Sequence, residues 1–196
     1  QMKDTERFSF TYSDYSELLD CIVDSGYSFS FFERNNNDEN VVFLRHDVDK
    51  SIKKAFEVAK IEYKKNIVST YFFLTRSPLY SILEPDTMKT IREIHMMGHR
   101  IGLHIDLSRI KEVSNSSIDP NNLINNEFHI MQSAIGNILK KNFSFHNPTK
   151  DLLKFSTFND DFICTYDDNF MLPNTKYLSD SNSFWREGNP LENIKN

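Results

Sequence analysis

The chain has 196 residues, a formal net charge of -5 and a sequence pI near 5.7, with 39% hydrophobic and 26% charged residues. A chain of this length and apolar content can bury a sizeable core, which excludes extensive disorder. The acidic excess without a basic stripe argues against nucleic-acid binding, and no apolar run reaches the roughly 18 residues of a membrane span. We therefore expect one globular domain over residues 1–196.

Helices and strands are expected to alternate along most of the chain. Apolar residues at helical spacing predict an opening helix, with Ser13 as its N-cap and Gly26 just past its end. Short apolar runs without polar alternation are typical of buried parallel strands. In chain order we expect a helix at 12–24, a loop at 34–40, a strand at 41–44, a helix at 51–65, a strand at 67–74, a helix at 85–97, a strand at 99–106, a helix at 120–140, a strand at 143–146, and short strands at 162–166 and 176–178.

This alternation favours a parallel α/β fold over segregated helices and strands. In parallel folds, functional side chains collect beyond the carboxyl ends of the strands. Three of the expected strands end in histidine or aspartate, namely the first (His46, Asp47 and Asp49), the third (His104 and Asp106) and the fourth (His146). The pattern predicts that imidazole and carboxylate groups meet at one edge of the sheet.

Asp47 and Asp49 form an Asp-x-Asp pair at the end of the first expected strand. Two carboxylates at one site do not both ionise readily unless a cation neutralises them. The pair can supply one metal ligand and one general base. Alternatively, one aspartate caps the helix that starts near Ser51 and the other is solvated. His104 favours the metal, because imidazole with carboxylate suits a borderline divalent ion such as zinc.

Three segments resemble the polysaccharide deacetylases of carbohydrate esterase family 4, the NodB-type homology domain. They are Arg45–Asp49 (RHDVD), Ser69–Leu74 (STYFFL) and Gly98–His104 (GHRIGLH). The resemblance implies a distorted, incomplete (β/α)7-type barrel over residues 41–186, after an N-terminal helix and loop over 1–40. A length of 196 residues leaves room for six or seven strands of such a barrel. The resemblance also implies a divalent metal, with zinc expected, and removal of N-acetyl groups from an amino sugar or glycan in surface-polysaccharide biosynthesis.

The resemblance assigns roles to single residues. Asp47 would be the general base, and Asp49 and His104 would be metal ligands. The family's second histidine, four residues after the first, falls on Ser108, which is a poor zinc ligand. We therefore expect His146 as the third ligand, with Asp106 in reserve. His146 also stands where the family carries an arginine before a proline, so a non-ligand role for it stays open.

Other polar residues receive separate interpretations. His46 is expected to pack behind the site, because neighbouring residues on a strand face opposite sides, and His99 is expected to support its strand. Near the C-terminus, Asp180 and Arg186 are candidates for contacting a glycan or holding Asp47, since arginine fixes carboxylates well. Trp185 is expected to be an ordinary packed residue. The family's general acid, a histidine in a Leu-x-His sequence, has no counterpart after Asp180.

Two further functions remain open at this stage. One is a deacetylase-like protein that binds a glycan or metal without hydrolysis. The other is a haloacid-dehalogenase-like phosphatase, which the Asp-x-Asp pair and the later Asp167-Asp168 fit loosely. The segment 2–10 is too polar for the apolar region of a signal peptide, and the two cysteines form no CxxC pattern. We therefore expect a cytoplasmic protein.

Overall fold

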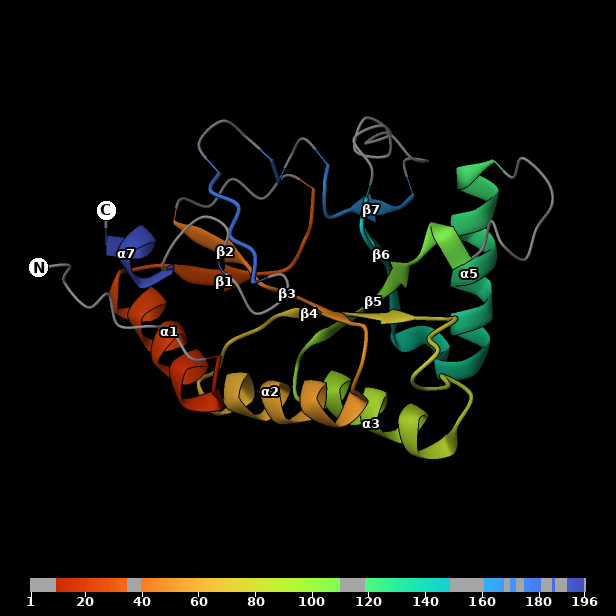
Figure 1. Cartoon of the computed structure of the whole chain (residues 1–196), viewed down its shortest axis with the longest axis horizontal. Helices are drawn as coiled ribbons and strands as arrows, with labels where there is room; N and C mark the ends of the chain where they lie inside the picture. The colour runs from red at the N-terminus through yellow and green to blue at the C-terminus, as the bar shows by residue number, and fades with distance from the viewer. Residues whose placement is uncertain are drawn as a thin grey trace, which may run out of the picture.

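The computed structural model describes residues 10–34, 40–109, 119–148, 161–167, 170–171, 175–180, 185 and 190–195. Figure 1 shows helices gathered along two sides of a group of strands. The elements are α1 (Tyr12–Asp24), β1 (Ser28–Ser30), β2 (Val41–Phe43), β3 (Arg45–Val48), α2 (Ile52–Lys64), β4 (Thr70–Leu74), α3 (Pro85–Met96), β5 (Arg100–Ile105), α5 (Pro120–Ile135), the 3-10 helix η1 (Gly136–Ile138), β6 (Leu139–Phe145), β7 (Ile163–Cys164) and α7 (Pro190–Lys195).

The main sheet has five parallel strands in the order β3-β4-β5-β6-β7. A second, two-stranded parallel sheet joins β1 to β2. This arrangement confirms the predicted α/β class with parallel strands and intervening helices. The barrel stays a prediction, because the described strands pair into two separate sheets.

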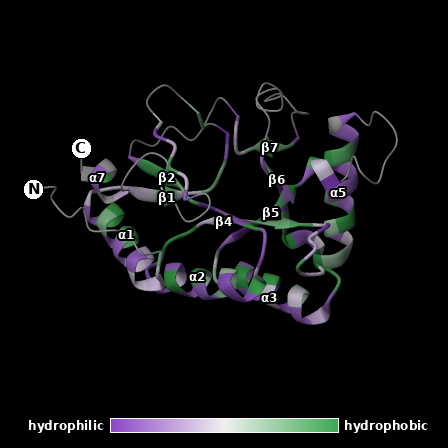
Figure 2. Cartoon of the chain, viewed as in Figure 1, coloured by the Kyte–Doolittle hydropathy of each residue, from purple (hydrophilic) through white to green (hydrophobic). Residues whose placement is uncertain are grey.

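Helices α2, α3 and α5 cover one face of the main sheet. In Figure 1, α2 and α3 run side by side beneath the strands, and α5 stands beyond β5 and β6. Figure 2 shows hydrophobic and hydrophilic residues on different sides of these helices, as expected for helices packed on a sheet. The core between the layers includes Ala59, Tyr71, Ile91, Leu103 and Phe143, all fully buried. Side chains alternate between the two faces of a strand, so the neighbours of these buried apolar residues point away from the helices.

The opposite face of the sheet carries Asp47, His104 and Ser144 together with a small aromatic cluster. Phe72 lies there against Phe32 and Phe170. Gly102 on β5 makes room for it, because a Cβ atom at Gly102 would lie 2.5 Å from the Phe72 ring and 2.9 Å from the Asn142 carbonyl oxygen. Glycine is required here by close approach. The same face carries His104 two residues further along β5.

The structure corrects several predicted boundaries. Helix α1 is capped by Thr11 instead of Ser13, because Thr11 and Asp14 bond each other's backbone N–H groups in a capping box. The helix expected at 120–140 ends at Ile135, where Gly136 adopts a φ of 79°, and β6 begins already at Leu139.

The strand expected at 41–44 is shorter in the structure, where β2 ends at Phe43. It is followed directly by β3, and the two strands belong to different sheets, with β2 paired to the unpredicted β1. No strand forms at 176–178, where the Tyr177 hydroxyl instead bonds the side chain of Arg45. The strand expected at 162–166 is reduced to Ile163–Cys164.

Candidate metal centre

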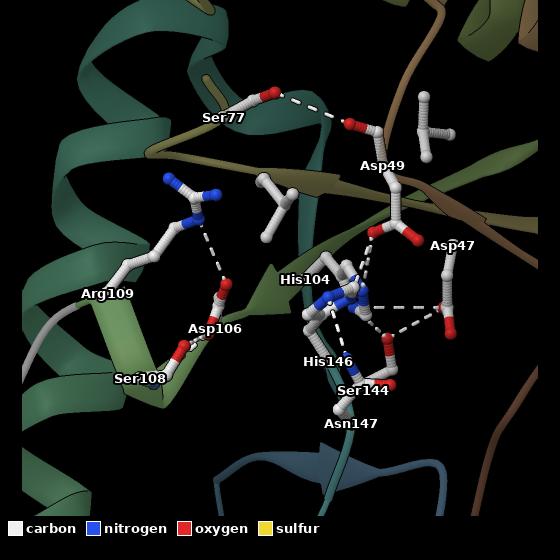
Figure 3. A network of polar contacts seen from close by, with 12 residues as sticks. Asp47, Asp49, Ser77, His104, Asp106, Ser108, Arg109, Ser144, His146 and Asn147 are labelled. Atoms are coloured by element: carbon white, nitrogen blue, oxygen red, sulfur yellow. Dashed lines mark hydrogen bonds and ion pairs between the residues drawn. The ribbon is translucent and has the colours of Figure 1, made fainter. Parts of the chain in front are cut away.

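Three of the predicted site residues come together at the carboxyl edge of the main sheet. Asp49 directly follows β3, His104 lies near the end of β5, and His146 directly follows β6. Because these strands are parallel, their carboxyl ends meet at the same edge. Figure 3 shows the three side chains pointing toward one another. The sequence-based metal ligands therefore converge.

The ligand atoms of this cluster lie close together. Oδ1 of Asp49 is 3.2 Å from Nε2 of His104 and 3.1 Å from Nδ1 of His146. All three atoms lie within 4.8 Å of one another. Tetrahedral ligands at about 2.1 Å from a zinc ion are roughly 3.4 Å apart. The spacing of the three atoms therefore suits a small divalent cation.

The hydrogen bonding of the cluster also fits a cation. Oδ1 of Asp49 and Nε2 of His104 are both buried, and neither makes a well-aligned hydrogen bond, although the two atoms lie 3.2 Å apart as an ion pair. Buried polar atoms without hydrogen bonds are uncommon and costly. A divalent metal with imidazole and carboxylate ligands would satisfy both atoms at once. The side chain of His104 is 1% exposed, whereas 30% of His146 and 37% of Asp49 are exposed. The cluster therefore has a buried side and a side open to solvent.

The charges of the cluster shift its pKa values. Burial lowers the pKa of His104, but the negative charges of Asp47 and Asp49 outweigh burial, so the pKa lies above its ordinary value. Burial raises the pKa of Asp49, but His104 and His146 outweigh it and the pKa is lowered. A site with this balance of charges attracts a cation, either a proton on His104 or a metal ion.

The other ring nitrogen of His104 is held by a serine. Nδ1 of His104 lies 2.7 Å from Oγ of Ser144, and that hydroxyl donates to Oδ1 of Asp47 at 2.8 Å. Asp47 itself lies 3.8 Å from Nδ1 of His104. Asp47 therefore contacts the edge of the imidazole ring away from Asp49, and Figure 3 shows Ser144 between the two groups.

Arg45 holds the second carboxylate oxygen of Asp47. Its guanidinium lies 3.4 Å from Oδ2 of Asp47 and donates to Thr165 and to Tyr166, each at 2.7 Å. It also lies over the ring of Tyr166, 4.6 Å from the ring centre. Burial lowers the pKa of Arg45, but Asp47 and the tyrosines outweigh it, so the pKa is raised. Arg45 thus stays charged and forms an ion pair with Asp47.

Other predicted residues lie outside the cluster. Asp106 accepts hydrogen bonds from the Ser108 hydroxyl and from Nε of Arg109, so neither Asp106 nor Ser108 joins the ligands. Asp180 is exposed and acts electrostatically on Tyr15 and His46. Arg186 and Asp168 lie outside the described residues. Trp185 stacks on Phe10 with ring centres 5.8 Å apart, in agreement with a packing role.

The predicted supporting histidines behave as expected. His46 faces the helices, where its ring stacks on Tyr71 with centres 4.6 Å apart. His99 is buried and its ring contacts the Ala59 carbonyl oxygen at 3.1 Å. Both predictions are confirmed.

The sequence analysis missed Ser144 and the role of Arg45. A signal for Ser144 exists, because residues 142, 144 and 146 alternate along one strand and therefore face the same side. The contacts of Arg45 with Thr165 and Tyr166 join segments 120 residues apart, and no local pattern indicates them.

Comparison with protein-family models, with curated proteins and with solved structures finds no match to this chain. The family resemblance thus rests on the three sequence segments alone. Within the part of the chain that the structure describes, no helix combines the length and apolar character needed to cross a bilayer.

Proposed function

We propose that this protein is a metal-dependent hydrolase that removes N-acyl groups of the acetyl type from an amino sugar or glycan, with zinc as the metal. The observation that carries the proposal is the convergence of Asp49, His104 and His146 at one edge of the sheet. Three protein ligands that leave a position open are typical of catalytic zinc sites, whereas structural sites are closed by a fourth ligand. The resemblance to polysaccharide deacetylases supplies the substrate class.

The proposed mechanism divides the work between the ligands and Asp47. A bound divalent metal supplies Lewis acidity toward the acyl carbonyl and toward a water molecule. Asp47 accepts the proton that this water loses as the water oxygen bonds to the acyl carbon, and this proton passes to the amine nitrogen as the C–N bond breaks. The Asp47 carboxylate is 24% exposed, pairs with Arg45 and has lone pairs beyond those that Ser144 and Arg45 engage. Because Ser144 and Arg45 hold the Asp47 carboxylate in place, less entropy is lost in orienting it during the reaction.

The proposal also includes roles for Asp180 and Arg186, a cellular location and a preference for zinc over magnesium. Asp180 and Arg186 are proposed to contact the glycan, and Arg45 fills the role of holding Asp47 that Arg186 was also expected to have. A cytoplasmic location would suit a substrate in surface-polysaccharide biosynthesis. The His-rich ligand set favours zinc chemistry over a magnesium-dependent phosphatase, because magnesium prefers oxygen ligands.

One contact supports a second candidate, a protein that binds metal and glycan without hydrolysis. Asp47 reaches the site through Ser144 and the Nδ1 edge of His104. This position is also that of a group which only orients a metal ligand. The two candidates differ in what Asp47 does, and amine release by the wild-type protein separates them.

The test combines a metal measurement with an amine-release assay. Purified protein is analysed for metal content and incubated with N-acetylated amino sugars and their oligomers. We expect about one zinc per chain and release of free amine, with Asp47→Asn retaining zinc and losing at least about 100-fold in rate, as for loss of a general base. Zinc binding without any amine release in wild type would favour the non-hydrolytic candidate. Absence of metal from wild-type protein, even after incubation with zinc, would overturn both.

A further inference from the structure

Ser144 occupies a buried position between the candidate metal ligand His104 and the carboxylate Asp47. It lies on β6 directly opposite His104 on β5 in the strand register, and its side chain is 0% exposed. Its hydroxyl contacts Nδ1 of His104 at 2.7 Å and Oδ1 of Asp47 at 2.8 Å. Both bonds have the length of strong hydrogen bonds.

The direction of these two hydrogen bonds follows from the chemistry of the groups. An ionised carboxylate only accepts, and a serine hydroxyl has one hydrogen to donate. Oδ1 of Asp47 accepts from Ser144 at 2.8 Å, and the other carboxylate oxygen, Oδ2, lies 3.4 Å from the guanidinium of Arg45. Ser144 therefore gives its hydrogen to Asp47, and its oxygen accepts from His104. That requires the hydrogen of a neutral His104 ring to be on Nδ1.

We infer that Ser144 is a positioning residue that selects the tautomer of His104, so that Nε2 presents its lone pair to a divalent metal beside Asp49. The inference rests on the metal site of the proposed function. Without the serine, Asp47 is 3.8 Å from Nδ1, which is too far for a hydrogen bond. The other tautomer would direct an Nε2–H toward Oδ1 of Asp49, 3.2 Å away, and block the ligand atom.

The first experiment reads the tautomer directly. Histidine nitrogen NMR on the wild-type protein at pH 9, with the His104 signals assigned from a His104→Gln variant, measures which nitrogen carries the hydrogen. We expect Nδ1–H in the metal-free protein, and we expect it to persist when diamagnetic Zn²⁺ is added. Nε2–H in the metal-free protein overturns the inference, and this reading needs no Ser144 variant to fold.

The second experiment measures the consequence for metal binding. Co²⁺ is titrated into wild type, Ser144→Ala and Ser144→Thr, and the affinity is obtained from the visible spectrum. Losing the partner of a ligating histidine costs about 10–100-fold in metal affinity, so we expect a loss in this range for Ser144→Ala and at least partial recovery for Ser144→Thr. Thr70→Val is the matched control, because it removes a buried hydroxyl of the same sheet that makes no hydrogen bond.

The outcomes separate the two proposals. If wild type binds Co²⁺ and Ser144→Ala binds it equally tightly with the Nδ1–H tautomer retained, the role of Ser144 is overturned and the metal site stands. If wild type binds neither Co²⁺ nor Zn²⁺, the metal site itself fails. Equal losses in Ser144→Ala and Thr70→Val would indicate general loosening of the sheet and would also overturn the role of Ser144.

Discussion

Oδ1 of Asp49 lies 3.1 Å from Nδ1 of His146, although the two residues are almost 100 positions apart in the chain. This contact makes His146 the third candidate ligand in place of a second histidine at position 108. We predict that His146→Asn lowers zinc affinity by more than about 100-fold, beyond the effect of losing an outer-shell partner. Isothermal titration with zinc measures the change. His129→Asn, at an exposed position on α5, is the control and should bind zinc like wild type. Equal affinity for zinc in His146→Asn and wild type would remove His146 from the site.

Metal binding should also stabilise the fold. A ligand that binds only the native state at 100 times its dissociation constant adds about 2.7 kcal/mol to the free energy of unfolding. For a chain of this size that corresponds to a rise of roughly 5–10 °C in Tm. We expect this rise on adding zinc, its reversal by a chelator, and its loss in Asp49→Asn. Thermal unfolding followed by circular dichroism measures it. A Tm that zinc leaves unchanged in wild type would contradict the proposed site.

The ligand set was predictable because it depends on strand ends. Apolar runs locate the parallel strands, and the histidines and aspartates that follow them meet wherever the strands are parallel neighbours. This reasoning brings Asp49, His104 and His146 to one edge, together with Asp47 and Asp106. The family resemblance was needed to single out Asp49 and His104 as ligands. The contacts around Asp47 follow from neither, because Arg45 is held by Thr165 and Tyr166, which β7 and its following turn bring next to it. Such contacts depend on how loops cross the sheet, and no periodicity in the sequence encodes that.

Strand boundaries were harder to predict for a similar reason. Residues 41–48 contain no glycine, proline or other turn signal that would mark the end of one strand and the start of the next. They form two strands because β2 pairs with β1 in one sheet and β3 pairs with β4 in the other. Likewise, the helix expected to continue to residue 140 stops because Gly136 leaves helical geometry. Isolated glycines are tolerated inside helices, so the sequence alone does not show which glycine ends one.

Gly102 should be intolerant of substitution even though it lies in the middle of a strand. A Cβ atom there would lie 2.5 Å from the Phe72 ring and 2.9 Å from the carbonyl oxygen of Asn142. We predict that Gly102→Ala lowers the free energy of unfolding by roughly 1–3 kcal/mol, as for overpacking elsewhere. Phe72→Leu in the same chain should recover part of this loss, because it relieves the ring contact but not the contact with the backbone. Urea unfolding of the two single variants and the double variant measures the coupling; strict additivity would show that the ring is not the obstacle.

Glu62 forms a second buried polar cluster, on the helix-covered face of the sheet. Its side chain is 0% exposed and accepts hydrogen bonds from the hydroxyls of Ser69 at 2.7 Å, Tyr71 at 2.8 Å and Tyr15. Nε2 of His46 lies 2.5 Å from Oε1, and Nδ1 of His99 lies 3.6 Å from Oε2. The cluster therefore joins α1, α2, β3 and β4 through one carboxylate.

The cluster should make stability depend on pH. Burial raises the pKa of Glu62, but His46 and the hydroxyl donors outweigh burial and lower it to about 2 from an ordinary 4.5. Its contribution to stability is therefore present above about pH 4.5 and is lost as the pH falls toward 2. For His46, burial lowers the pKa, but Glu62 outweighs it and the pKa is raised above 6.5, so its contribution is lost as the pH rises through that raised pKa.

We predict that Glu62→Gln lowers the free energy of unfolding at pH 6 by roughly 3–5 kcal/mol, the usual cost of breaking a buried pair. The loss should shrink toward pH 2, because wild-type Glu62 becomes protonated there. Urea unfolding from pH 2 to pH 9 measures both effects. Glu57→Gln is the matched control on the same helix, because Glu57 pairs with Lys60 at the surface, where such pairs contribute at most about 1 kcal/mol. If the free energy of unfolding of Glu62→Gln fell between pH 4.5 and pH 2 as steeply as that of wild type, Glu62 would not be the group that titrates. The cluster would then stabilise the fold through packing instead of charge.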